Sequence, residues 1–229
     1  MSKLFMYGSD LQELEQLMML VPNFLPKRSG VIVVQRIRNE PEFLQHGRCS
    51  KRITDYCGSK STRSLSKQIA AGDISYEEIL GKCFENSDSY SLKRRLTDLN
   101  RTHNGEFFLS PIHESRFNTV CRLQNEPFES RATPYLATLF LLTANDKLWC
   151  AAKDHVYLDS FDFKKMHLNG INTDGYAIYQ MAKTLQRGQE YIKLNEISDK
   201  HLIGDRAFKA IIHSVLITKY GAAVLQMKF

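Results

Sequence analysis

The chain has 229 residues, of which 43% are hydrophobic and 24% are charged, and its formal net charge is +6. These values predict a globular protein with a core, large enough for one large domain or two small ones, and they exclude a histone-like basicity. The basic balance permits an acidic partner, either nucleic acid or an acidic protein surface, but a basic surface without a partner fits it equally well.

The start of the chain, MSKLFMYGSDLQELEQ, lacks the apolar segment of a signal peptide. No apolar run reaches the roughly 18 residues of a membrane span, so we expect a cytoplasmic protein with no membrane partner. The five cysteines follow no regular pairing pattern and are expected to be reduced thiols. They are Cys49, Cys57, Cys83, Cys121 and Cys150.

The first half predicts helices together with a little β-structure. A helix over 9–21 begins with a capping-box pair, Ser9 and Gln12, and a β-branched run predicts a strand over 31–37. The stretch 46–68 is rich in basic residues and has no apolar periodicity, so it predicts an exposed loop that leads into a helix over 62–71.

Two more helices are predicted before residue 104. Ser75 and Glu78 form a second capping box, which begins a short helix. A helix over 89–101 should bury its leucines and expose its basic side chains, with Lys93, Arg94 and Arg95 outward. The turn signal in RTHNG, residues 101–105, suggests a boundary between a basic α+β domain over 1–104 and a helical domain over 105–229.

The second half predicts helices throughout. The densest apolar stretch, 133–156, should form a buried helix pair interrupted near Asn145, with Thr133 as the helix cap. Flanking helices are expected over 110–123, 173–186, 195–202 and 205–220, with Ile112, Tyr176 and Cys121 facing inward. Cys150, within 133–156, is also expected to be a small core residue. The predicted fold class is therefore mainly α, with a small N-terminal α+β part.

Several stretches resemble uncharacterised proteins carried on mobile genetic elements of Firmicutes, including phages and conjugative elements. The similar stretches are YGSDLQELEQLM, QIAAGDISYEEIL, FFLSPIHESRF, YLATLFLLTANDKLW and ITKYG. The resemblance implies a setting rather than an activity. By analogy, proteins in that setting are often DNA-handling accessories or inhibitors of host defence, such as anti-CRISPR or anti-restriction proteins.

Two sites are candidates in the first half. His46, Cys49, Cys57 and Cys83 could together bind zinc, although the spacing H-x2-C-x7-C is not that of a standard knuckle and unpaired thiols explain it as well. A basic surface could contact phosphates or an acidic groove, or could be only a solvated face. Its residues are Arg48, Lys51, Arg52, Lys60, Arg63, Lys67, Lys93, Arg94 and Arg95.

Two further sites are weaker. The helices around Gly204 could form a helix-turn-helix in which Arg206, Lys209 and His213 read bases, but the wide apolar stripe favours a buried bundle helix. The cysteines and histidines, and the group Asp159, Asp162 and His167, fall in no catalytic motif, so no catalytic residue and no cofactor are expected.

The sequence therefore favours a non-enzymatic binding protein of a mobile element, which inhibits or modulates a host nucleic-acid machine through its basic N-terminal surface. The alternatives are a DNA-binding accessory of the element and a metal-assisted nuclease.

Overall fold

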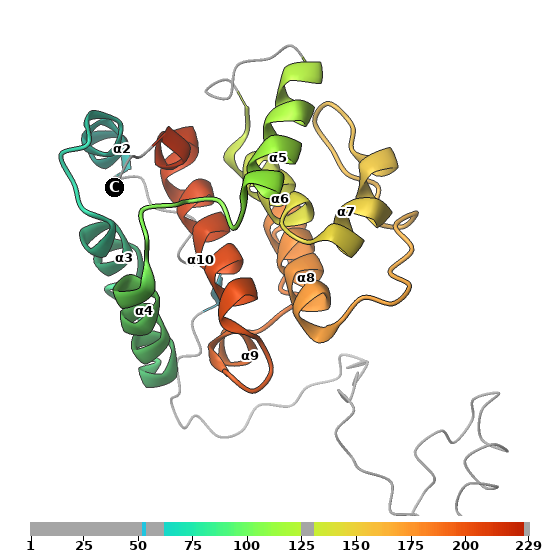
Figure 1. The fold of residues 1–229 in the computed structure, drawn as a ribbon. Helices are drawn as coiled ribbons and strands as arrows, with labels where there is room; N and C mark the ends of the chain where they lie inside the picture. Colours follow the sequence, from blue (N-terminus) through green and yellow to red (C-terminus); the bar gives the residue numbers. More distant parts are fainter. Residues whose placement is uncertain (1–51, 54–61, 125–130, 227–229) are drawn as a thin grey trace, which may run out of the picture. The chain divides into compact units, whose positions relative to one another are not determined.

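The computed structural model describes residues 52–53, 62–124 and 131–226. These ranges contain helices and one isolated antiparallel bridge, Val156–Phe161, but no strand (Figure 1). The mainly α fold class is therefore confirmed for this part of the chain. The predicted helix over 9–21 and strand over 31–37 lie outside the described residues.

The contacts divide the chain into two units, Met1–Gly47 and Arg48–Phe229, and every element below belongs to the second unit. The described helices are, in order, α2 (Thr62–Ala71), α3 (Tyr76–Phe84), α4 (Tyr90–Thr102), α5 (Pro111–Leu123), α6 (Thr133–Thr143), α7 (Asp146–Ala152), η3 (Lys153–His155), α8 (Thr173–Arg187), α9 (Leu194–Ser198), α10 (Asp205–Tyr220) and η4 (Gly221–Gln226).

Helix α6 is buried on all sides, as its sequence predicts. Every side chain from Tyr135 to Thr143 is buried, because apolar and small residues cover the whole circumference of the helix. Thr133 does not cap this helix. The N-cap position is held by Ala132, and the Thr133 hydroxyl instead donates to the Thr218 carbonyl at 2.9 Å, which ties α6 to α10.

Helix α10 runs between the helices of the first half and those of the second. It packs against α2 and α3 on one side and against α6 and α8 on the other (Figure 1). Among the described residues, the segment Asp205–Leu225 is long and apolar enough to cross a membrane, but 61% of its apolar window is buried within the fold. Its place in the core accounts for its apolar composition.

Local signals in the sequence set several helix ends. The Ser75 hydroxyl accepts from the Glu78 amide at 3.2 Å and the Glu78 carboxylate accepts from the Ser75 amide at 2.9 Å, so the predicted capping box is present. Asn145 separates α6 from α7 and caps α7 by accepting from the Leu148 amide. Gly188 ends α8 in the left-handed region, with φ of 66°.

The described residues on the two sides of the predicted 104/105 boundary share one hydrophobic core. Tyr76 of α3 is hydrogen-bonded to His213 of α10, with 2.8 Å between the hydroxyl and Nε2. His213 Nδ1 lies 2.6 Å from the carbonyl oxygen of Phe107, so α3, α10 and the chain before α5 meet at one buried histidine.

Three side chains expected to face inward are exposed, and each lies on the solvent side of its helix. Ile112 is 60% exposed in the first turn of α5, and Tyr176 is 50% exposed on the solvent side of α8. Cys150 is exposed because the short helix α7 buries only Leu148 and Ala152. Cys121 is buried, as predicted.

Candidate anion-binding site

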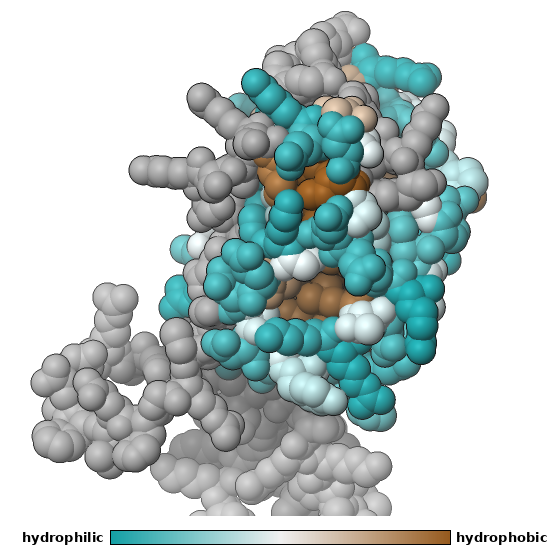
Figure 2. All heavy atoms as spheres, turned by 90° about the vertical axis from the view of Figure 1, so that its left-hand side faces the viewer, coloured by the Kyte–Doolittle hydropathy of each residue, from teal (hydrophilic) through white to brown (hydrophobic). Residues whose placement is uncertain are grey.

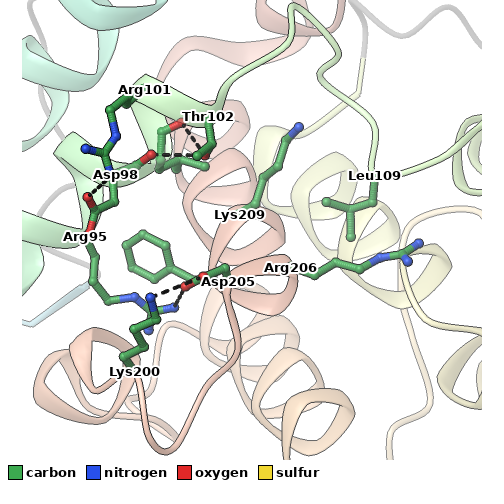
Figure 3. Close-up of a pocket in the computed structure, with 11 residues that line it drawn as sticks. Arg95, Asp98, Arg101, Thr102, Leu109, Lys200, Asp205, Arg206 and Lys209 are labelled. Carbon is green, nitrogen blue, oxygen red and sulfur yellow. Dashed lines mark hydrogen bonds and ion pairs between the residues drawn. The ribbon is translucent and has the colours of Figure 1, made fainter.

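A cavity of about 400 Å³ opens between α4 and α10 (Figure 3). Five basic and two acidic side chains line it, which leaves three formal positive charges. The lining residues are Arg95, Asp98, Leu99, Arg101, Thr102, Leu109, Lys200, Asp205, Arg206, Phe208 and Lys209. We call this cavity the α4–α10 pocket. Its excess of positive charge suits an anionic ligand.

Arg95 forms a fixed wall of the α4–α10 pocket. Its side chain is only 6% exposed, donates to the Ile197 carbonyl at 2.9 Å, and pairs with the Asp205 carboxylate at 3.1 Å. Its guanidinium carbon lies 4.0 Å from the centre of the Phe208 ring, a cation–π contact. These contacts on three sides hold the guanidinium in one orientation.

The prediction that Arg95 faces outward was therefore wrong. Arg95 follows Leu92 by three positions and adjoins Leu96, so it falls on the inward stripe of α4. Its neighbours Lys93 and Arg94 lie on the opposite face and are exposed, as predicted.

Three of the five pocket cations are paired with carboxylates. Arg101 bonds to Asp98 at 3.1 Å, and Lys200 lies 3.6 Å from Asp205, the same acid that holds Arg95. Figure 3 shows these pairs as dashed lines, whereas Arg206 and Lys209 extend from α10 without one. No described carboxylate lies within ion-pair distance of either side chain.

Burial in the pocket disfavours the charged forms of two of the cations that line it. Burial lowers the pKa of Lys209, and Glu106 opposes this only in part. Burial also lowers the pKa of Arg95, despite the carboxylate of Asp205 beside it. A bound anion would favour the charged form of both groups, so ligand binding and the charge of the pocket should reinforce each other.

A second cavity of about 330 Å³ adjoins the first and shares Leu109 and Arg206 with it. Its charges balance. The basic residues are Arg116 and Arg206, the acidic ones are Asp146 and Asp174, and Arg116 pairs with Asp146 at 2.7 Å. Because it has no excess of positive charge, this second cavity suits an anionic ligand less well than the α4–α10 pocket does.

Much of the basic surface expected from the sequence lies outside the described residues. This holds for Arg48, Lys51 and Lys60, and for the side chain of Arg63. Lys67 is exposed, and so is Arg52, which lies 3.9 Å from Glu190. The face formed by α2, α3 and α4 is mainly hydrophilic, with two apolar areas between the polar side chains (Figure 2).

The proposed zinc set is described only at Cys83, since His46, Cys49 and Cys57 lie outside the described residues. Cys83 is buried in the core on α3. Within the described ranges no three His, Cys, Asp or Glu side chains are grouped as a metal would require, and this includes the group of Asp159, Asp162 and His167.

The buried histidines have structural partners. His113 Nδ1 accepts from the Leu109 amide at 3.2 Å, so its Nε2 carries the proton and donates to the Phe140 carbonyl at 2.8 Å. His213, proposed above to read bases, is fully buried against Tyr76 and Phe107 and cannot reach a ligand. Burial also raises the pKa of the Cys121 thiol to about 11, which leaves it a poor nucleophile at neutral pH.

Comparisons of the chain with protein-family models, curated proteins and solved structures yield no match.

The grouping of the pocket residues was missed from the sequence. The sequence suggests a role for Arg206 and Lys209 only within a helix-turn-helix, and it suggests no role for Lys200. One signal was present. Arg206 and Lys209, three residues apart, are basic residues on one side of an otherwise apolar helix, and such a pair marks the edge of a buried helix that reaches solvent.

Proposed function

We propose that this chain is a non-enzymatic binding protein whose α4–α10 pocket contacts an anionic partner. The observation that carries the proposal is that Arg206 and Lys209, in a cavity with three formal positive charges, have no carboxylate partner among the described residues. Lys and Arg side chains contact the phosphate groups of nucleic acids in this way.

The partner that we propose is a host nucleic-acid machine in the cytoplasm, which the protein would inhibit or modulate in the manner of an anti-CRISPR or anti-restriction protein. The resemblance to proteins of mobile elements supports this setting, and the charge of the pocket supports the contact. The phosphates of such a machine's guide or substrate, or an acidic groove of its protein, are the surfaces that the pocket would fit.

An affinity pull-down from the host, with and without nuclease, tests the proposal. We expect the wild-type chain to recover a nucleoprotein, and the double variant Arg206→Gln/Lys209→Gln to lose it. A double variant Lys153→Gln/Lys164→Gln is the matched control, because it removes two exposed charges outside the pocket. If no nucleoprotein is recovered while the purified chain shifts DNA alone, the DNA-binding accessory replaces the present proposal.

A further inference from the structure

We infer that the α4–α10 pocket binds a phosphate monoester, such as the phosphorylated end of a nucleic-acid strand or a mononucleotide, in preference to the phosphodiesters of a continuous backbone. This inference rests on the proposed function, since it names the ligand class of the same pocket. Four features of the pocket support it: its size, its charge, its rigidity and its apolar wall.

The size of the cavity is that of a small-ligand site. A volume of about 400 Å³ lies within the roughly 300–1,000 Å³ range of small-molecule pockets. Residues from α4, from the chain before α5, from the turn before α10 and from α10 itself surround it. A strand end or a single nucleotide can enter such a cavity, whereas a continuous backbone passes over its mouth.

The excess positive charge of the pocket favours a dianion over a monoanion. A phosphate monoester carries about −1.5 to −2 at neutral pH, whereas each phosphodiester carries a single negative charge. Arg206 and Lys209 are separated by about one turn of α10 and have no carboxylate partner among the described residues. A monoester brings up to two negative charges to this pocket, whereas a diester brings one.

The third and fourth features are a fixed cation and an apolar wall. Arg95 is 6% exposed, and its guanidinium is held by the Ile197 carbonyl and the Asp205 carboxylate. A cation held in one place in this way loses little freedom when an anion binds beside it. Leu99, Leu109 and Phe208 line the same cavity and offer apolar surface to the organic part of the ligand.

The test compares short single-stranded oligonucleotides that differ only in a 5′-phosphate or a 5′-hydroxyl, with a fluorophore at the 3′ end. We expect the wild-type chain to bind the phosphorylated strand at least about tenfold more tightly. This preference should disappear in Arg206→Gln/Lys209→Gln and persist in Lys153→Gln/Lys164→Gln. Thermal unfolding of all three proteins checks that each one is folded.

Competition separates the two sources of the monoester. If AMP displaces the phosphorylated strand and adenosine does not, the pocket accepts a free mononucleotide. If AMP has no effect while the 5′-phosphate preference holds, the ligand is a strand end. Equal binding of both strands, lost in the pocket variant, would overturn the monoester inference and leave the proposed function in place. If neither strand binds and AMP leaves the melting temperature unchanged, the inference is also overturned, and the pull-down alone then decides the proposed function.

Discussion

At the scale of single residues, Leu139 shows how much of the stability depends on α6. Its side chain is fully buried, whereas Leu123, at the end of α5, is 77% exposed. We expect Leu139→Ala to lower the free energy of unfolding by about 2–5 kcal/mol, because it removes buried methyl groups and leaves a cavity, whereas Leu123→Ala should change it by less than about 0.5 kcal/mol. Urea unfolding of both variants measures the difference. Equal effects would mean that α6 is not the centre of the core.

Arg95 and Arg94 are neighbours in sequence with opposite environments. Replacing Arg95 by Met leaves the Ile197 carbonyl without its donor and removes the pair with Asp205. We expect Arg95→Met to cost about 1–3 kcal/mol in the free energy of unfolding, while Arg94→Met, on the exposed face, should be nearly neutral. If the two variants were equally stable, the buried position of Arg95 would be wrong.

The sequence predicts residue environments well only where the helical period decides them. Leu92, Leu96 and Leu99 were assigned correctly because they share one face of α4. Arg95 lies on the same face, but a charged residue is normally assigned to solvent, and its partners come from α9 and α10, which are about a hundred positions later in the chain. Partners so distant in sequence leave no local signal, and for this reason the meeting of Arg95 with α9 and α10 could not be predicted.

At the scale of helices, two glycines separate the effect of backbone conformation from that of packing. A Cβ atom would meet nothing within 4 Å at either Gly81 or Gly188, but Gly188 has φ of +66° and Gly81 lies inside α3. We expect Gly188→Ala to destabilise the protein by about 1 kcal/mol and Gly81→Ala to stabilise it by about 0.5–1 kcal/mol. Thermal unfolding measures the melting temperature of each variant. A change of the same sign in both variants would refute the left-handed conformation at the end of α8.

Helix ends and helix types could be predicted because their signals are local. Ser75, Asn145 and Gly188 act on atoms within a few positions of themselves. A domain boundary is different, since it depends on which surfaces pack together. The turn signal at Asn104–Gly105 marks a real break between α4 and α5, yet Tyr76 and Phe107, on its two sides, meet the same histidine, His213.

At the scale of the whole molecule, the buried histidines predict loss of stability in mild acid. Burial holds the pKa of His113 and of His103 at about 4, and that of His213 well below its ordinary value. In the unfolded chain each of these pKa values returns to about 6.5. Below that pH the unfolded chain binds protons that the folded chain does not, so stability is full at neutral pH and falls as the pH decreases.

We expect the free energy of unfolding to drop by about 2 kcal/mol between pH 7 and pH 5 from His113 alone. Its Nδ1 atom already accepts from the Leu109 amide, so protonation breaks a hydrogen bond inside the core. Urea unfolding at a series of pH values measures the effect, with His167→Gln as a control because that side chain is exposed. Stability that stayed constant or rose on acidification would contradict the neutral state of the buried histidines.

The proposed function depends on whether the α4–α10 pocket binds an anion, and the salt dependence of nucleic-acid binding tests this most directly. The measurement is a titration of a labelled 5′-phosphorylated strand at several salt concentrations, with the wild-type chain, Arg206→Gln/Lys209→Gln and Lys153→Gln/Lys164→Gln. We predict that binding weakens with salt, and that only the pocket variant shows both lower affinity and a slope reduced by about one to two ions. Equal affinity and equal slope for the two variants would contradict the assignment of Arg206 and Lys209 as the anion-binding residues.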